Sequence, residues 1–159
     1  KQAEELEESI KTRVFVYEKI NKELRNQVQE SKKQVLKLNE ELNLYQGIVE
    51  KSNDIILRIN KEGYILFHNP AFEQLNFISG IEKNNLFCYF GEGDFPGPEQ
   101  LQDKLEKGFQ KINYKIQVQL KAKTWFIFSF TPIKNKKGLI MEIQVSGRNI
   151  DFTSNQYPI

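Results

Sequence analysis

Residues 63–75 read GYILFHNPAFEQL and join a strand pattern directly to a helix-start pattern. The segment begins with a turn glycine and continues with the aliphatic and aromatic residues typical of a β-strand. Asn69 and Pro70 then fit an N-cap followed by a proline at the first helical position. Phe72 and Leu75, three residues apart, are expected to face inward from that short helix. The segment predicts a turn, a strand and a helix in immediate succession.

Similar patterns on both sides of this segment predict a small α+β domain. We expect strands at residues 53–60, 64–68, 114–120, 124–133 and 139–150. Residues 91–97 form a glycine-rich acidic loop, and Pro98 begins a second helix whose Leu101, Leu105 and Phe109 face inward. The predicted fold is a five-stranded antiparallel sheet with helices packed on one face.

The first fifty residues follow a different, seven-residue period that is typical of a coiled coil. Valine dominates the a positions and leucine is the commonest d residue, a combination that favours two parallel strands. Asn21 is the single asparagine among the a positions. It can pair with Asn21 of a second copy, which makes other registers less favourable. We therefore expect a homodimer whose seam contains Ile10, Val14, Tyr17, Asn21, Leu24, Val28, Val35, Leu38, Leu42, Tyr45 and Val49.

The alternative is that this apolar stripe is the buried face of a helix in a globular bundle. A helix of this length is a rod of about 70 Å, longer than a domain of this size could cover. The organisation we predict is a coiled-coil signalling helix at 1–50, a globular domain at 51–153 and an exit segment at 154–159.

Composition restricts the function. No apolar run approaches the roughly 20 residues that span a bilayer, and no signal-peptide pattern opens the chain. The sequence begins without Met, so we expect a cytoplasmic piece of a longer protein, with no membrane contact by this fragment. The net charge of +2 argues against nucleic acid as a partner. The single cysteine, Cys88, excludes an intrachain disulfide and a thiol cluster for zinc.

Several motifs in order resemble those of PAS sensory domains. They are Gly63-Tyr64-Ile65, Asn69-Pro70-Ala71-Phe72 with Leu75, Gly93-Asp94 and the D-x-T sequence Asp151-Phe152-Thr153. The resemblance covers about residues 48–153. It implies the PAS fold, and it implies that Asp151 and Thr153 tie the last strand to an exit helix. Ordinary turn and capping chemistry is the alternative for these two residues.

The resemblance also implies a place for ligands, between the sheet and the middle helices. His68 lies outside the helix from which haem-binding relatives usually supply their ligand. Cys88 lacks the Asn, Arg and Gln that surround the reactive cysteine of the light-sensing flavin branch, so we expect a small buried thiol. We expect a core filled by phenylalanine and no bound cofactor. Any pocket would be lined by Cys88, Tyr89, Tyr114, Ser129 and Ser146, chosen from strand parity.

Two functions follow from these observations. The first is a sensory and dimerisation module that relays conformational change through the coiled coil, as in two-component systems. Its effector would be a kinase, cyclase or phosphatase domain elsewhere in the full-length chain. The second is a structural scaffold or protein-binding module with no signal input. We expect no enzymatic activity, because the sequence offers no nucleophile with a base, metal cluster or phosphate loop.

Overall fold

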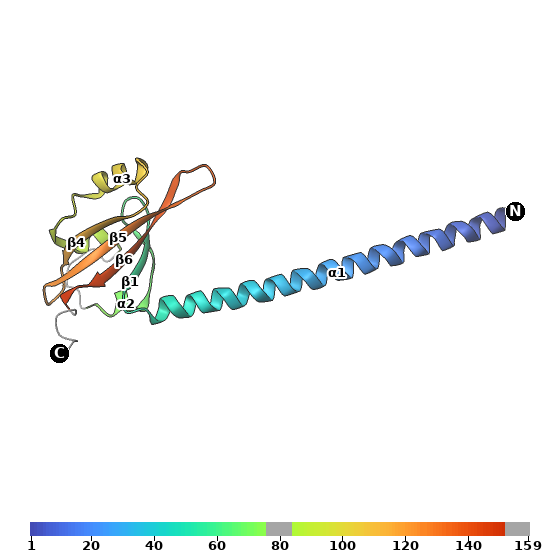
Figure 1. The fold of residues 1–159 in the computed structure, drawn as a ribbon, viewed down its shortest axis with the longest axis horizontal. Helices are drawn as coiled ribbons and strands as arrows, with labels where there is room; N and C mark the ends of the chain where they lie inside the picture. Colours follow the sequence, from blue (N-terminus) through green and yellow to red (C-terminus); the bar gives the residue numbers. More distant parts are fainter. Residues whose placement is uncertain (76–83, 152–159) are drawn as a thin grey trace, which may run out of the picture. The chain divides into compact units, whose positions relative to one another are not determined.

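The computed structural model describes residues 1–75 and 84–151. It contains a long N-terminal helix and a mixed domain built on one antiparallel sheet (Figure 1). The chain divides into two compact units, Lys1–Gly47 and Ile48–Ile159, which are described separately below.

Helix α1 spans Gln2–Lys51; its residues as far as Gly47 belong to the first unit, and its last four belong to the second. It contains no proline, and its rise of 1.5 Å per residue makes it about 75 Å long. None of its side chains is buried. A helix with exposed aliphatic residues along its length lacks the partner surface that its apolar stripe requires.

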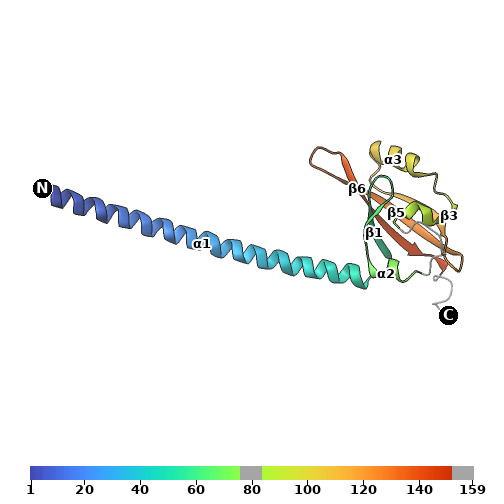
Figure 2. The ribbon, with the colours of Figure 1, turned by 180° about the vertical axis from the view of Figure 1, so that it is seen from behind.

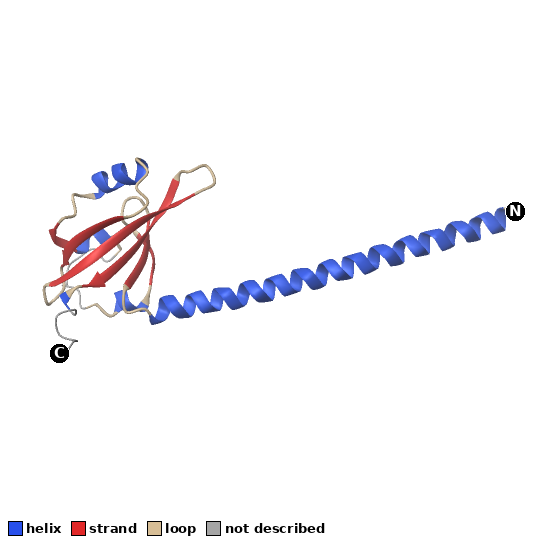
Figure 3. Ribbon diagram, in the orientation of Figure 1, coloured by secondary structure: helices blue, strands red, loops and turns tan. Residues whose placement is uncertain are grey.

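The second unit contains a six-stranded sheet in the order β2-β1-β6-β5-β4-β3, with every neighbouring pair antiparallel (Figure 3). Its strands are β1 (Ile55–Ile59), β2 (Ile65–His68), β3 (Phe90–Gly93), β4 (Ile112–Val118), β5 (Thr124–Lys134) and β6 (Ile140–Asn149). The central strands alternate buried and more exposed residues, so one face of the sheet carries the core.

Three short helices cover that face: α2 (Pro70–Glu73), the 3₁₀ helix η1 (Leu86–Tyr89) and α3 (Pro98–Glu106). Phe72 of α2, Leu86 of η1 and Leu101 of α3 join a single cluster of buried residues with the inward side chains of the sheet. This arrangement confirms the predicted antiparallel sheet with helices on one face.

The sixth strand, β3, is a correction to the predicted five. Residues 91–97 were expected to be a loop, yet Phe90–Gly93 pairs with β4 at the sheet edge (Figure 2). Gly93 permits this pairing because a Cβ at its position would collide with the carbonyl oxygen of Lys115. Its φ of +148° also favours glycine. A four-residue strand with two glycines has no side-chain alternation by which it could be predicted.

The end of α3 is a second correction. Phe109 was expected on the inward face of this helix, but α3 ends at Glu106 and Phe109 is 53 % exposed. Gly108 adopts φ +100°, and its N–H donates to the carbonyl of Leu105. A glycine with positive φ just past a helix end is a common way to stop a helix, and it turns the following residue away from the core.

Candidate functional site

Asn69 connects three parts of the second unit through its side chain. The Oδ1 atom accepts from the N–H of Ile56 at 2.9 Å, and Nδ2 donates to the carbonyls of Asp54 (2.9 Å) and Val49 (3.2 Å). These partners belong to β1, to the linker that precedes it and to the last turns of α1. Asn69 is wholly buried, and its amide group therefore holds the linker against the start of the sheet.

This role differs from the predicted N-cap. Asn69 does occupy the N-cap position of α2 and has extended dihedral angles, but its side chain makes no capping hydrogen bond. The side chain is already committed to Ile56, Asp54 and Val49, because burial requires its polar atoms to be satisfied nearby.

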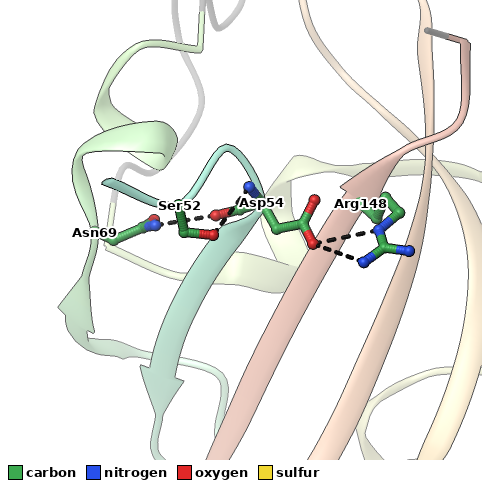
Figure 4. A network of polar contacts seen from close by, with 4 residues as sticks. All are labelled: Ser52, Asp54, Asn69 and Arg148. Carbon is green, nitrogen blue, oxygen red and sulfur yellow. Dashed lines mark hydrogen bonds and ion pairs between the residues drawn. The ribbon is translucent and has the colours of Figure 1, made fainter. Parts of the chain in front are cut away.

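The linker between α1 and β1 also contacts the last strand, as Figure 4 shows. The guanidinium group of Arg148 donates from Nε and Nη2 to Asp54 Oδ2 at 3.2 and 3.1 Å. The backbone N–H of Asp54 donates to the Ser52 hydroxyl at 3.2 Å. The pairing of Ile55 with Gly147 brings the two charged residues together. This ion pair is solvent-exposed, so its contribution to stability is small, about 0–1 kcal/mol.

Asp151 fixes the chain where β6 ends. Its carboxylate accepts a hydrogen bond from the N–H of Trp125 at 2.9 Å, and the N–H of Ile150 donates to the Trp125 carbonyl at 3.0 Å. The residue therefore ties the end of β6 to the start of β5. Thr153, the second predicted relay residue, and the predicted exit segment 154–159 lie outside the described residues.

The end of β6 thus has two attachments within four residues. Arg148 binds the linker that leads to α1, and Asp151 binds β5 at the point where the chain leaves the sheet. We call residues 148–151 the β6 terminus. The β6 terminus therefore contacts both the linker that precedes β1 and the start of β5. The sequence signalled Asp151 through the D-x-T motif, whereas Asp54 and Arg148 are 94 residues apart and became partners only through strand pairing.

The interior between the sheet and the helices contains contacting aromatic rings. Phe95 stacks on Phe87 with ring centroids 5.2 Å apart, and it meets Phe90 edge-on at 5.0 Å. It also contacts Tyr114 and Phe130 at 5.6 and 6.0 Å. These separations are typical of favourable aromatic pairs, so the rings pack against one another in the part of the fold where PAS ligands were expected.

The five predicted pocket residues do not all lie on one side of the sheet. Tyr89 and Tyr114 are buried with the core. Ser129 and Ser146 pair with each other across β5 and β6, where strand parity places them on the sheet face opposite Phe128 and Phe130.

Cys88 is exposed, which corrects the expectation of a buried thiol. In a 3₁₀ helix, residues three apart share a face, so Leu86 and Tyr89 point inward and Cys88 between them points outward. Burial raises the pKa of the Tyr89 phenol above its ordinary value, and the electrostatic effect of the neighbouring Cys88 raises it further.

His68 ends β2 and lies beside α2. Its Nδ1 atom is 3.6 Å from a Glu73 carboxylate oxygen, and its ring contacts Phe72 with centroids 5.5 Å apart. In residues 1–75 and 84–151, no three histidine, cysteine or acidic side chains are grouped so that they could hold a metal ion.

The predicted coiled-coil seam is a second candidate site. Its aliphatic and aromatic side chains from Ile10 to Tyr45 are between 49 and 66 % exposed, Asn21 is exposed, and Val49 is partly buried. Within the described part of the chain, no helix combines the length and apolar character needed to cross a bilayer.

Solved structures share the fold of this chain, whereas the two sequence comparisons found no match. No protein-family model and no curated protein sequence matches this chain. Among solved structures, an RNA-binding light-oxygen-voltage receptor superposes with a TM-score of 0.55 at 16 % identity, covering 68 % of this chain and 33 % of the receptor. This chain thus corresponds to about one third of that receptor's length.

Two isolated PAS domains are matched over almost their whole length. The PAS domain of an HTR-like protein from Haloarcula marismortui has a TM-score of 0.51 and 17 % identity, covering 75 % of this chain and 99 % of that one. The PAS domain of nitrogen regulation protein NR(II) from Vibrio parahaemolyticus has a TM-score of 0.50 and 20 % identity, covering 67 % and 98 %. The domain that follows α1 therefore has the PAS fold.

Proposed function

We propose that this chain is a sensory and dimerisation module of a cytoplasmic signalling protein. In this proposal two copies pair through α1, and conformational changes pass between the PAS domain and an effector elsewhere in the full-length protein. The observation that carries the proposal is the uncovered Val and Leu seam of α1. A second copy in parallel would bury that seam, with Asn21 facing its own copy.

The attachment of α1 to the sheet supports a relay. The last turns of α1 are bonded to Asn69, and the linker is bonded to Arg148 on β6. Since both anchors belong to the PAS domain, a shift of β1 or β6 would be transmitted to the helix. In a parallel pair, small rotations of stiff helices can bias a distant two-state element.

The names of the structural neighbours agree with a regulatory role. One is a receptor and another is a nitrogen regulation protein. We propose a kinase, cyclase or phosphatase effector, as in two-component systems, and no catalytic activity in this chain itself. The competing function is a scaffold that dimerises through α1 and receives no signal.

Sedimentation equilibrium of the purified chain tests the dimer. We expect a dimer at micromolar concentration. Leu24→Lys with Val28→Lys should weaken dimerisation on the order of a hundredfold or more, because two charges per chain would be buried in the seam. Asn26→Lys with Gln29→Lys adds the same charge on the outer face and should leave the dimer intact. A monomeric wild-type chain, or equal losses in both variants, would contradict the proposal.

A further inference from the structure

The hairpin that joins β5 and β6 extends beyond the rest of the sheet. The β5–β6 pairing continues to Lys134 and Ile140, whereas β4 begins opposite Phe130 and β1 ends opposite Ile143. Residues 134–141 therefore have no strand on either side, and Figure 1 shows this loop projecting from the sheet. We call residues 134–141 the hairpin tip.

The backbone of the hairpin tip is held in one conformation. Asn135 Oδ1 accepts hydrogen bonds from the N–H groups of Lys137 (2.9 Å) and Leu139 (3.0 Å). The Asn135 N–H donates to the Leu139 carbonyl at 2.9 Å, and the Gly138 N–H donates to the Asn135 carbonyl at 3.0 Å. Because its turn is already ordered, the hairpin tip would lose little conformational entropy on binding a surface.

The side chains of the hairpin tip combine positive charge with exposed apolar surface. Lys134, Lys136 and Lys137 are exposed and take part in none of the ion pairs found among the described residues. Leu139 and Met141 are 60 and 57 % exposed, while Ile140 between them is buried and anchors the strand.

Acidic groups do not offset this charge. Residues 134–141 contain no Asp or Glu. The next carboxylate along the strand, Glu142, accepts a hydrogen bond from Arg58 Nε at 2.7 Å and is thereby neutralised.

We propose that the hairpin tip docks on an anionic lipid surface. Lysines beside a lipid headgroup layer gain electrostatic attraction, and neighbouring Leu and Met side chains can enter the boundary between headgroups and acyl chains. Nucleic acid would use the lysines but would leave Leu139 and Met141 without a partner. We expected no membrane contact because the sequence contains no spanning segment, and that criterion does not detect interfacial docking.

Co-sedimentation of the whole chain with sucrose-loaded phospholipid vesicles tests the proposal. The chain should bind phosphatidylcholine vesicles that contain phosphatidylserine and should not bind pure phosphatidylcholine. Each lysine near such a surface raises the binding constant about fivefold. The triple variant Lys134→Gln, Lys136→Gln, Lys137→Gln should therefore bind about a hundredfold more weakly. The control Lys19→Gln, Lys121→Gln, Lys123→Gln removes the same charge elsewhere and should bind nearly as well as wild type.

The apolar half of the surface has its own test. Leu139→Ser with Met141→Ser should weaken vesicle binding by roughly tenfold, since less apolar area would enter the interface. If this variant bound as well as wild type, the surface would be one for polyanions in general, and the lipid assignment would be wrong. Absence of binding to the anionic vesicles, or equal losses in the tip and control triple variants, would overturn the proposal. All substituted residues are exposed, and thermal melting of each variant verifies that it is folded.

Discussion

At the scale of single residues, Asn69 illustrates why a polar side chain is retained in an apolar core. Its three hydrogen bonds join one N–H of β1 and one carbonyl each of the linker and of the last turns of α1. A buried amide group that meets all its partners can stabilise a unique arrangement. Without it, the Ile56 N–H and the Asp54 carbonyl would lose these hydrogen bonds, and an unsatisfied buried polar group costs about 1–3 kcal/mol. The Val49 carbonyl would keep a second hydrogen bond, from the Ser52 N–H at 3.4 Å.

We therefore expect Asn69→Ala to lower the free energy of unfolding by about 2–4 kcal/mol. The melting temperature of a domain of this size should then fall by roughly 10–20 °C. Chemical denaturation followed by circular dichroism measures the change. Asn113 is an exposed residue of β4, and Asn113→Ala should cost less than about 0.5 kcal/mol. Equal effects of the two substitutions would show that the Asn69 hydrogen bonds are not the cause.

Tyr89 gives a prediction about pH. Burial raises the pKa of its phenol in the folded state, so at alkaline pH the folded chain holds a proton that the unfolded chain has lost. The free energy of unfolding should be unaffected by this group below the unfolded pKa of about 10 and should fall as the pH rises above it. Urea denaturation between neutral and strongly alkaline pH should show a smaller fall for Tyr89→Phe than for wild type. Parallel pH profiles would contradict the assigned role of Tyr89.

At the scale of elements, the helices and strands whose residues repeat with a regular period could be predicted from the sequence. An element that depends on a few local contacts could not. The heptads predicted residues 1–50 as a helix, and α1 is Gln2–Lys51. Strands β5 and β6 have long alternating patterns and begin and end within a residue or so of their predicted positions. Strand β3 was missed because its pairing depends on the close approach of Gly93 to β4 rather than on side-chain alternation.

The candidate site was only partly predictable for a related reason. Asp151 was selected from a resemblance, but its bond to Trp125 depends on the register of β5 and β6. Asp54 and Arg148 have no sequence signal of their own. Ser129 and Ser146 were assigned to the ligand side because the strand parity was guessed, and a shift of one residue reverses the face of every side chain on a strand.

Asn21 in α1 gives a prediction about the stability and specificity of the proposed pairing of this helix. In the proposed parallel dimer, Asn21→Val should raise the melting temperature, because an apolar a residue would replace an amide that dimerisation buries. It should also reduce specificity, so that species other than the dimer are found by sedimentation velocity. Asn26→Val, on the outer face, is the matched control and should change neither property. A loss of stability in Asn21→Val would contradict the proposed heptad register.

At the scale of the whole molecule, the β6 terminus is the place where both ends of the PAS domain meet. Arg148 is bonded to the linker from α1, and Asp151 is bonded to β5 where the chain leaves the sheet. Both contacts are exposed and contribute little to stability. Contacts of this kind can be broken and remade without unfolding the domain, which is what a relay requires.

Asp151→Ala should therefore separate stability from signalling. The loss of one exposed hydrogen bond to the Trp125 N–H costs about 0.5–2 kcal/mol, so the melting temperature should fall by no more than several degrees. If the proposed relay operates through Asp151, the output of the full-length protein, or its response to stimulus, should nevertheless change, because the end of β6 would lose its hydrogen bond to the start of β5. Asp103 is also exposed, and its ion pair among the described residues is with Lys107 on the surface, so Asp103→Ala is the matched control and should leave output unchanged. Normal output from a folded Asp151→Ala protein would mean that Asp151 is an ordinary turn residue and that the signal leaves the domain by another route.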